Sequence, residues 1–533
     1  MKFRKRNMMI RTCCFIVVTT LLFCCSSKES RVNDDDLQKE DSDIVGDRDD
    51  VCTDDSEEND SFFDDFENDD EYYDEYSDEY PDEYPDEYPD EIEKDVCSPN
   101  PCIGIPYSDR NCYSDGEEYR CGCNTGYYWD GEKCLKRTDN IIYVDINATG
   151  MNNGTSWEDA FNELQDGQDA ISEGEIWVAK GIYIPRYREH ENDHEDPRSH
   201  CFSLRNNIAL YGGFSGNESL LEERDWVKNE TVLSGDLDRD GKRSDGDCYH
   251  VIYNLHIDNT AVIDGFVISG GNANNEDSPG YIDNSSKHAG GMYNIYNASP
   301  VIRNCVFRDN FAMLDGGAIM NSNNSNPLVE NVVFENNEAR FGGAVSNYKS
   351  SPVIINSKFI NNAVDLDGGV GGAIINRDES SPLIEGSFFE GNIASSGAAI
   401  RSMWESKPRI INSVFQMNSA VGEGGALSDT DYAETLVENT TFFNNQAGLG
   451  GGAVHSAGYS DTTVINSIFR NNYTADNGKG GAVFNSVSEI TIISSLFFKN
   501  SSGVGGAVAS WGAGDTVLIN CTISDNEAKR YLR

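Results

Sequence analysis

The chain has 533 residues, too many for one compact domain, and a formal net charge of −50 at pH 7. Residues 31–95 hold 32 Asp and Glu against 4 Lys and Arg, so more than half of the net charge lies in a short stretch. Such a charge repels phosphate backbones, which argues against nucleic acid as a partner and favours cations and basic surfaces.

Residues 1–25 have the pattern of an export signal. A basic start precedes the apolar residues 13–23, a run too short to span a bilayer as a stable anchor. The end of the segment resembles a bacterial lipoprotein signal, with Leu22 three residues before Cys25. This resemblance implies cleavage before Cys25, a lipid on Cys25 and anchoring to the outer membrane. The alternative is an ordinary secretory signal and a secreted protein.

Residues 26–95 are predicted to be an acidic, disordered linker. Their Pro-Asp-Glu-Tyr repeat combines like charges, which repel one another, with Pro, which resists helix formation. We expect an extended stalk that holds the folded part away from a membrane. The alternatives are a cation-binding segment or a ligand that uses its tyrosines.

Residues 97–134 contain six of the fifteen cysteines, which predicts a disulfide framework formed in an oxidising compartment. Spacing alone leaves the connectivity open. The segment is similar to an epidermal-growth-factor-like module, and this resemblance implies the pairs Cys97–Cys112, Cys102–Cys121 and Cys123–Cys134. So short a segment buries little core, and we expect the bridges to stabilise a spacer or interaction module.

Residues 141–235 are expected to form an N-terminal cap and the first coils of a repeat domain. Strands at residues 141–144 and 176–179 flank a segment in which Ser156 is placed to N-cap a helix. One apolar face of that helix would carry Trp157, Phe161 and Leu164. An amphipathic helix at this place would cover the open edge of the sheets that follow.

Residues 236–533 contain a loose unit that recurs nine times. Each unit reads Val-Ile-x-Asn-x-x-Phe-x-x-Asn and then, after several residues, Gly-Gly-Ala and an aliphatic residue. The Phe column consists of Phe307, Phe334, Phe359, Phe389, Phe415, Phe442, Phe469, Phe497 and Ile523. The Asn three residues later is Asn310, Asn337, Asn362, Asn392, Asn418, Asn445, Asn472, Asn500 or Asn526. The Asn three residues earlier is replaced only in two units, by Gly386 and Ser494.

The first glycine of each unit is assigned to Gly290, Gly316, Gly342, Gly371, Gly397, Gly424, Gly451, Gly480 and Gly505. Repeats of this length, with short strands and turn residues, predict an all-β solenoid, namely a right-handed parallel β-helix. Equivalent residues of successive coils would stack, so Phe forms an interior column and Asn forms amide ladders. Gly-Gly-Ala marks a corner that excludes a side chain. Loops after the Asn column vary most and are expected to carry function.

The paired motifs across residues 290–526 resemble those of the chlamydial polymorphic membrane proteins, and residues 141–183 resemble the start of bacterial surface proteins of the pectate-lyase-like superfamily. The first resemblance implies adhesion, and the second implies a β-helix that in some members is a polysaccharide lyase or hydrolase. The chain stops at Arg533 before a further Gly-Gly-Ala, so we expect a truncated sequence.

One acidic segment, residues 236–247, has the spacing of a calcium loop. Its oxygen ligands would come from Asp236, Asp238, Asp240, Ser244 and Asp247, and Gly241 would permit the turn. The alternative is a polar loop without an ion. Structural calcium is the only cofactor that the sequence suggests.

Other charged residues are interpreted as solvated loop residues. These are Asp365, Asp367, Asp429, Asp431, Arg377, Arg401, Lys479 and His455. Because no coil stands out as a catalytic site, the sequence favours a non-enzymatic adhesin or structural protein. Its expected partners are a protein or glycan on a host or neighbouring cell. The alternative is a lyase or hydrolase that acts on acidic glycans.

Overall fold

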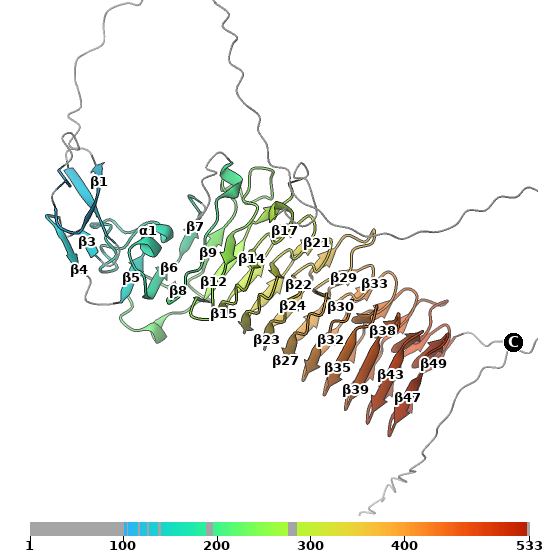
Figure 1. The fold of residues 1–533 in the computed structure, drawn as a ribbon. Coiled ribbons are helices and arrows are strands. Elements are labelled where there is room, and N and C mark those ends of the chain that lie inside the picture. Colours follow the sequence, from blue (N-terminus) through green and yellow to red (C-terminus); the bar gives the residue numbers. More distant parts are fainter. Residues whose placement is uncertain are drawn as a thin grey trace, which may run out of the picture. The chain divides into compact units, whose positions relative to one another are not determined.

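The computed structural model describes residues 101–103, 105–115, 118–124, 127–129, 131–136, 140–187, 196–275 and 285–529. The predictions for Cys25, for Cys97 and for residues 1–95 fall outside these ranges. From residue 140 on, the described chain winds into a solenoid of parallel strands (Figure 1). None of its described helices combines the length and the apolar character needed to cross a membrane.

Each full coil contributes one strand to each of four parallel sheets, named here sheets 1 to 4 in their order within a coil. Sheet 1 starts after each Gly-Gly-Ala and contains β10 (Ile252–Leu255), β14 (Met292–Ile295), β18 (Ile319–Ser322), β22 (Val345–Tyr348), β26 (Ile374–Arg377), β30 (Ile400–Ser402), β34 (Leu427–Asp429), β38 (Val454–Ala457), β42 (Val483–Ser486) and β46 (Val508–Trp511). Sheet 2 contains β5 (Ile141–Val144), β6 (Gly174–Ala179), β8 (Ile208–Phe214), β11 (Val262–Asp264), β15 (Val301–Arg303), β19 (Leu328–Glu330), β23 (Val353–Ile355), β27 (Leu383–Glu385), β31 (Arg409–Ile411), β35 (Glu434–Glu438), β39 (Asp461–Ile465), β43 (Glu489–Ile493) and β47 (Thr516–Ile519).

Sheet 3 carries the Phe column and contains β7 (Gly181–Tyr183), β9 (Thr231–Ser234), β12 (Phe266–Ser269), β16 (Val306–Arg308), β20 (Val333–Glu335), β24 (Lys358–Ile360), β28 (Phe388–Glu390), β32 (Val414–Gln416), β36 (Thr441–Phe443), β40 (Ile468–Arg470), β44 (Leu496–Phe498) and β48 (Thr522–Ser524). Sheet 4 contains β13 (Asn272–Ala273), β17 (Phe311–Ala312), β21 (Glu338–Ala339), β25 (Ala363–Val364), β29 (Ile393–Ala394), β33 (Ser419–Ala420), β37 (Gln446–Ala447), β41 (Tyr473–Thr474), β45 (Ser501–Ser502) and β49 (Glu527–Ala528). The residues after each Asn, predicted to be loop, therefore begin with a short strand.

The predicted interior Phe column is confirmed. The eight rings from Phe307 to Phe497 are fully buried, and neighbouring rings stack with centroids 4.5 to 5.4 Å apart. In-register pairing of sheet 3 places each ring on the next, as in Phe307 and Phe334. Ile523 ends the column and is half exposed. The stack, with the Val and Ile side chains of sheets 1 and 2, forms the hydrophobic core.

The predicted Asn ladder is also confirmed, at the corner between sheets 3 and 4. From Asn310 to Asn526, each side-chain amide donates to the Oδ1 atom of the next Asn at 2.8 to 3.1 Å. The second amide hydrogen is also used, as Asn337 Nδ2 donates to the Phe307 carbonyl at 2.9 Å. The buried amides are therefore hydrogen-bonded on both their donor and acceptor sides, which is what makes burial of Asn favourable.

Three further ladders were not predicted. Sheet 1 carries an amide ladder in which neighbouring side chains bond at 2.8 to 2.9 Å: Asn254, Asn294, Asn321, Asn347 and Asn376. Hydroxyl ladders line the other two corners, where a backbone N–H donates to the hydroxyl of the next coil. Between sheets 1 and 2, Ser325 N donates to Ser350 Oγ at 3.1 Å, and between sheets 2 and 3, Ser357 N donates to Ser387 Oγ at 3.2 Å.

The other Asn column of each unit lies at the corner between sheets 2 and 3, and backbone conformation explains it. Asn304, for example, has φ +50°, in the left-handed region that Asn tolerates better than most residues. The two exceptions fit the same reason, since Gly386 has φ +60° and Ser494 has φ +50°. The prediction that this column also forms an amide ladder holds only in part, as in the bond from Asn331 Nδ2 to Asn304 Oδ1 at 2.6 Å.

The Gly-Gly-Ala corner excludes side chains for the two expected reasons. The first glycine has positive φ, as at Gly316 with +64°. At the second, a Cβ atom on Gly425 would lie 2.1 Å from a backbone oxygen of the next coil. The assignment of Gly290 as a first glycine is wrong by one residue. Pairing of Met292 with Ile319 puts Ala289, with φ +55°, in register with Gly316.

The capping helix predicted to start at Ser156 is not confirmed. Helix α1 spans Leu164–Asp169, and its N-cap is Glu163. The Ser156 hydroxyl instead accepts a bond from the Asp159 N–H at 3.1 Å and forms a turn. Phe161 is recruited by sheet 2, because its N–H donates to the Tyr143 carbonyl at 3.0 Å. α1 packs against β5 and β6, and Leu164 joins the core.

Single 3-10 turns complete the described helices: η1 (Pro197–Ser199), η2 (Leu221–Glu223) and η3 (Ser285–Lys287). The cysteine-rich segment forms antiparallel pairs of β1 (Ser108–Asp115) with β2 (Glu118–Cys123) and of β3 (Tyr127–Trp129) with β4 (Cys134–Lys136). Disulfides join Cys102 to Cys121 and Cys123 to Cys134, the same pairs that the resemblance implies. Cys112 is also disulfide-bonded.

Candidate functional site

Three of the five residues of the expected calcium loop converge. One carboxylate oxygen each of Asp236, Asp238 and Asp240 lies within 4.8 Å of the others, at the end of the coil that follows β9. The Gly241 N–H donates to Asp236 Oδ2 at 2.8 Å and so tightens the turn. A divalent cation prefers oxygen ligands of this kind, and the arrangement fits one.

The other two residues of that loop point to each other. The Ser244 N–H donates to Asp247 Oδ2 at 2.5 Å, and the Asp247 carboxyl is buried. Burial raises the pKa of Asp247 above its usual value, while its bond from Ser244 opposes that change. A cation at the three aspartates would gain these two ligands only if their mutual bonds broke.

Several charged residues are buried, although the sequence favours an interpretation as solvated loop residues. That interpretation is wrong for them. On the outward side of sheet 1, Arg377 forms an ion pair with Asp315, and Asp315 also lies 3.1 Å from His288 Nδ1. All three side chains are buried. Burial would raise the pKa of Asp315, but Arg377 and His288 hold it below its usual value. Asp365 and Asp367, in contrast, are exposed as expected.

A second polar cluster lies further along the same side of sheet 1. Arg401 Nη1 donates to the Ser396 and Ser428 hydroxyls, each at 2.7 Å. Ser428 Oγ lies 3.3 Å from Nδ1 of His455, which is buried on β38 and stacks on Phe484. Burial lowers the pKa of His455 to about 3, and Arg401 adds to the effect. A neutral imidazole beside a serine has the parts of a nucleophile and a base, but the Ser428 hydroxyl is fully buried.

Asp429 is buried as well, in the sheet 1 column that carries the amide ladder. It pairs in register with Ser402 on one side and Ser456 on the other. Thr462 Oγ1 donates to its carboxylate at 2.9 Å. Burial raises the pKa of Asp429 to about 6, although hydrogen bonds from threonines and the charge of Arg401 oppose the rise. This carboxyl group therefore lies within the wall of the solenoid, out of reach of a substrate.

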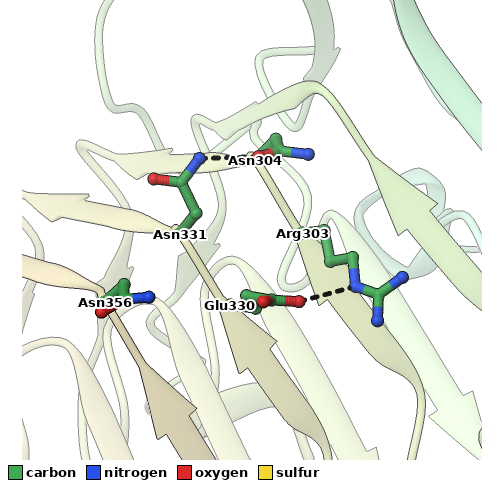
Figure 2. Close-up of a pocket in the computed structure, with 5 residues that line it drawn as sticks. All are labelled: Arg303, Asn304, Glu330, Asn331 and Asn356. Atoms are coloured by element: carbon green, nitrogen blue, oxygen red, sulfur yellow. Dashed lines mark hydrogen bonds and ion pairs between the residues drawn. The ribbon is translucent and has the colours of Figure 1, made fainter. Parts of the chain in front are cut away.

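A shallow depression of about 330 Å³ lies at the corner between sheets 2 and 3, lined by Arg303, Asn304, Glu330, Asn331 and Asn356 (Figure 2). Arg303 Nε donates to Glu330 Oε2 at 2.9 Å, and Figure 2 shows the Asn331 amide directed at Asn304. Asn304 and Asn331 are corner residues with positive φ. Backbone geometry thus accounts for the asparagines of the depression, and two side-chain bonds, Asn331 to Asn304 and Arg303 to Glu330, join neighbouring coils.

The turns between sheets 1 and 2 carry an unexpected feature, named here the aromatic edge: Trp404, Tyr432 and Tyr459. Their side chains are 47, 58 and 69% exposed, and their φ angles are +54°, +65° and +62°. The three turns belong to consecutive coils, since the Glu405 N–H donates to the Asp431 carbonyl and the Tyr432 N–H to the Gly458 carbonyl. An earlier coil has Asn323 and Asn324 at the equivalent turn, also with positive φ.

Sequence reasoning missed the aromatic edge because it read only the repeated columns. A signal was present, since each of these residues falls four to five positions after the aliphatic residue of a Gly-Gly-Ala or Gly-Ala-Ala unit. Burial of Asp429, Arg377 and His455 gave no such signal, because it depends on neighbouring coils and their loops.

A family model described as "Right handed beta helix region" matches residues 292–469. Among solved structures, the fold is similar to the catalytic unit of a thermostable GH87 alpha-1,3-glucanase from Streptomyces thermodiastaticus strain HF3-3, with 12% identity and a TM-score of 0.36. That similarity covers 72% of this chain and 68% of the other. No curated protein matches the sequence. The described solenoid is a right-handed parallel β-helix, as its stacked parallel sheets and the family match indicate.

Proposed function

We propose that the chain is an exported surface protein that binds other molecules without processing them, an adhesin or interaction scaffold. The aromatic edge is the observation that carries this proposal. In three consecutive coils this turn carries a bulky aromatic residue at positive φ, a conformation that such residues rarely adopt, and the rings are exposed to a ligand. The interior columns supply stability, so the edge is available for a ligand. The partners are a protein or glycan on a host or neighbouring cell.

Binding of the purified full chain to intact cells tests this proposal. We expect saturable binding that unlabelled protein displaces. The same preparation is incubated with polygalacturonate and other acidic glycans, with and without calcium. Unsaturated products or new reducing ends would contradict the non-enzymatic proposal and favour the lyase or hydrolase. Absence of saturable binding to any cell type would contradict the adhesin.

The same proposal anchors the protein to the outer membrane through a lipid on Cys25, with residues 26–95 as a stalk and the disulfide-bonded segment as an epidermal-growth-factor-like module. Support comes from Leu22 before Cys25 and from the two disulfides. Growth with an alkyne-labelled fatty acid should label the wild-type chain and leave Cys25→Ser unlabelled. Label on that variant, or unlabelled wild type in the medium, would instead indicate the secretory alternative.

We also propose that Asp236, Asp238 and Asp240 hold a structural calcium ion, because their carboxylates converge. Calcium should raise the thermal unfolding midpoint of the wild type more than that of Asp238→Asn, since a ligand that binds only the folded state stabilises it. Because both proteins carry the same acidic residues 31–95, calcium bound there contributes equally. An equal rise in the two proteins would contradict the site.

A further inference from the structure

The surroundings of the aromatic edge identify its chemistry. Four carboxylates flank the three rings and are named here the flanking carboxylates: Glu405, Asp431, Glu434 and Asp461. Only one of them has an ion-pair partner among the described residues, because Lys407 Nζ lies 2.9 Å from Glu434. Arg401 partly balances the charge of Asp431. The edge therefore combines electron-rich ring faces with a net negative charge.

Rings elsewhere in this solenoid are covered by cations. Lys479 Nζ lies 3.9 Å from the Trp511 ring centroid, and the Arg470 guanidinium lies 5.5 Å from that of Phe443. Within the described part of the chain, no Lys or Arg lies over Trp404, Tyr432 or Tyr459. Tyr432 and Tyr459 stack on each other with centroids 5.7 Å apart and an interplanar angle of 16°. A cation from outside the chain can therefore meet the rings next to the flanking carboxylates.

We propose that the aromatic edge is a docking site for a basic segment of a protein partner, with Lys or Arg side chains over the rings and beside the flanking carboxylates. This inference rests on the proposed binding function and names its site and ligand class. A cation gains most where an aromatic face and an anionic group act together. An acidic polysaccharide would be repelled, and a neutral glycan, although its hydroxyls can donate to carboxylates, has no positive charge to pair with them. The net charge of −50 also steers basic partners to the molecule.

The test compares the full chain with a triple variant, Trp404→Asn, Tyr432→Asn and Tyr459→Asn. Asn is the residue that an equivalent turn already carries, so the variant should be at least as stable as the wild type. The control, Tyr296→Asn, removes a tyrosine that is 48% exposed with φ +52° at the same kind of turn in another coil. Thermal unfolding confirms that each protein is folded.

The probe is an immobilised peptide of alternating Arg and Gly, beside a matched peptide in which Gln replaces Arg. We expect the wild type and the Tyr296→Asn control to bind the Arg peptide alike, and the triple variant to bind about tenfold more weakly, since each exposed cation–π contact contributes modestly. Residues 31–95 are the same in all variants, so any binding there cancels in the comparison.

A second variant, Glu405→Gln with Asp431→Asn, keeps the rings and removes two charges. It should bind the Arg peptide more weakly and lose affinity less steeply as salt rises, because screening acts on exposed charge pairs. Equal affinity of the wild type and the triple variant would overturn the proposed site. The proposal of a basic ligand would be overturned if the wild type bound a neutral glucan oligosaccharide independently of salt and the triple variant did not bind it. Saturable cell binding by the triple variant at the wild-type level would support the proposed adhesin function and contradict only the proposed binding site.

Discussion

Asp429 gives the sharpest test of the ladder account, because it replaces the amide of a ladder column with a carboxylate. Burial raises its pKa from 3.8 to about 6, so the ionised form is disfavoured in the folded protein. At about 1.4 kcal/mol for each unit of pKa, the ionised carboxylate costs roughly 3 kcal/mol of folding free energy at neutral pH. Asn cannot ionise, and its amide can also donate along the column, as Asn376 does to Ser402 at 3.3 Å.

Asp429→Asn should therefore stabilise the protein, and the gain should depend on pH. Between the unfolded pKa of 3.8 and the folded pKa of about 6, the folded protein binds the proton more strongly than the unfolded chain. The stability that wild type has near pH 4 is therefore lost as pH rises to about 6, and the full cost applies above that. The variant avoids this loss, so its advantage should be greatest near pH 8 and should vanish near pH 4.

Urea unfolding of the full chain at a series of pH values measures this advantage as a shift of the transition midpoint. The control is Asp367→Asn, at an exposed aspartate, for which we expect little change. A variant less stable than the wild type at pH 8, or a gain that does not change with pH, would contradict a raised pKa for the buried Asp429 carboxyl.

Three further predictions concern the repeated columns. Phe389→Ala should lower the free energy of unfolding by about 3 to 5 kcal/mol, because the ring stacks between two others with centroids 4.6 and 4.5 Å away. Urea unfolding measures the loss, and a loss smaller than that from replacing an exposed Phe by Ala would contradict the stack. Asn418→Ala leaves buried ladder groups unpaired, above all the backbone N–H of Asn392, which donates to Asn418 Oδ1 at 3.1 Å, so amide hydrogen exchange should rise in the neighbouring coils. Unchanged protection would contradict the ladder. Gly425→Ala should destabilise the solenoid strongly, because its Cβ would lie 2.1 Å from a backbone oxygen. Gly246→Ala should be tolerated, because its Cβ would meet only a serine hydroxyl at 3.4 Å, and thermal unfolding compares the two variants.

The sequence was sufficient to predict the residues whose role repeats in every coil. Phe389 and Asn418 recur with fixed spacing because each coil places them against the equivalent side chains of the neighbouring coils. Gly-Gly-Ala was predictable for the same reason. The one-residue error at Gly290 arose because Ala289 adopts the positive φ that glycine has in the other coils. The Gly-Gly pair of this coil therefore lies one residue later than in the others.

Other features depend on contacts that no local pattern carries. The strands of sheet 4, such as β17, have only two residues, too few to show alternation. The helix expected from Ser156 is lost to sheet 2, because Phe161 pairs with Val144. Burial of Asp429 and His455 follows from the coils beside them, and their sequence neighbours resemble those of exposed turns.

The most direct test of the account is cell binding by the full chain that carries Trp404→Asn, Tyr432→Asn and Tyr459→Asn together. Because the interior columns supply stability and the exposed aromatic edge supplies binding, these substitutions should weaken binding about tenfold while the variant stays folded. Saturable binding of a folded triple variant at the wild-type level would contradict the assignment of binding to the aromatic edge.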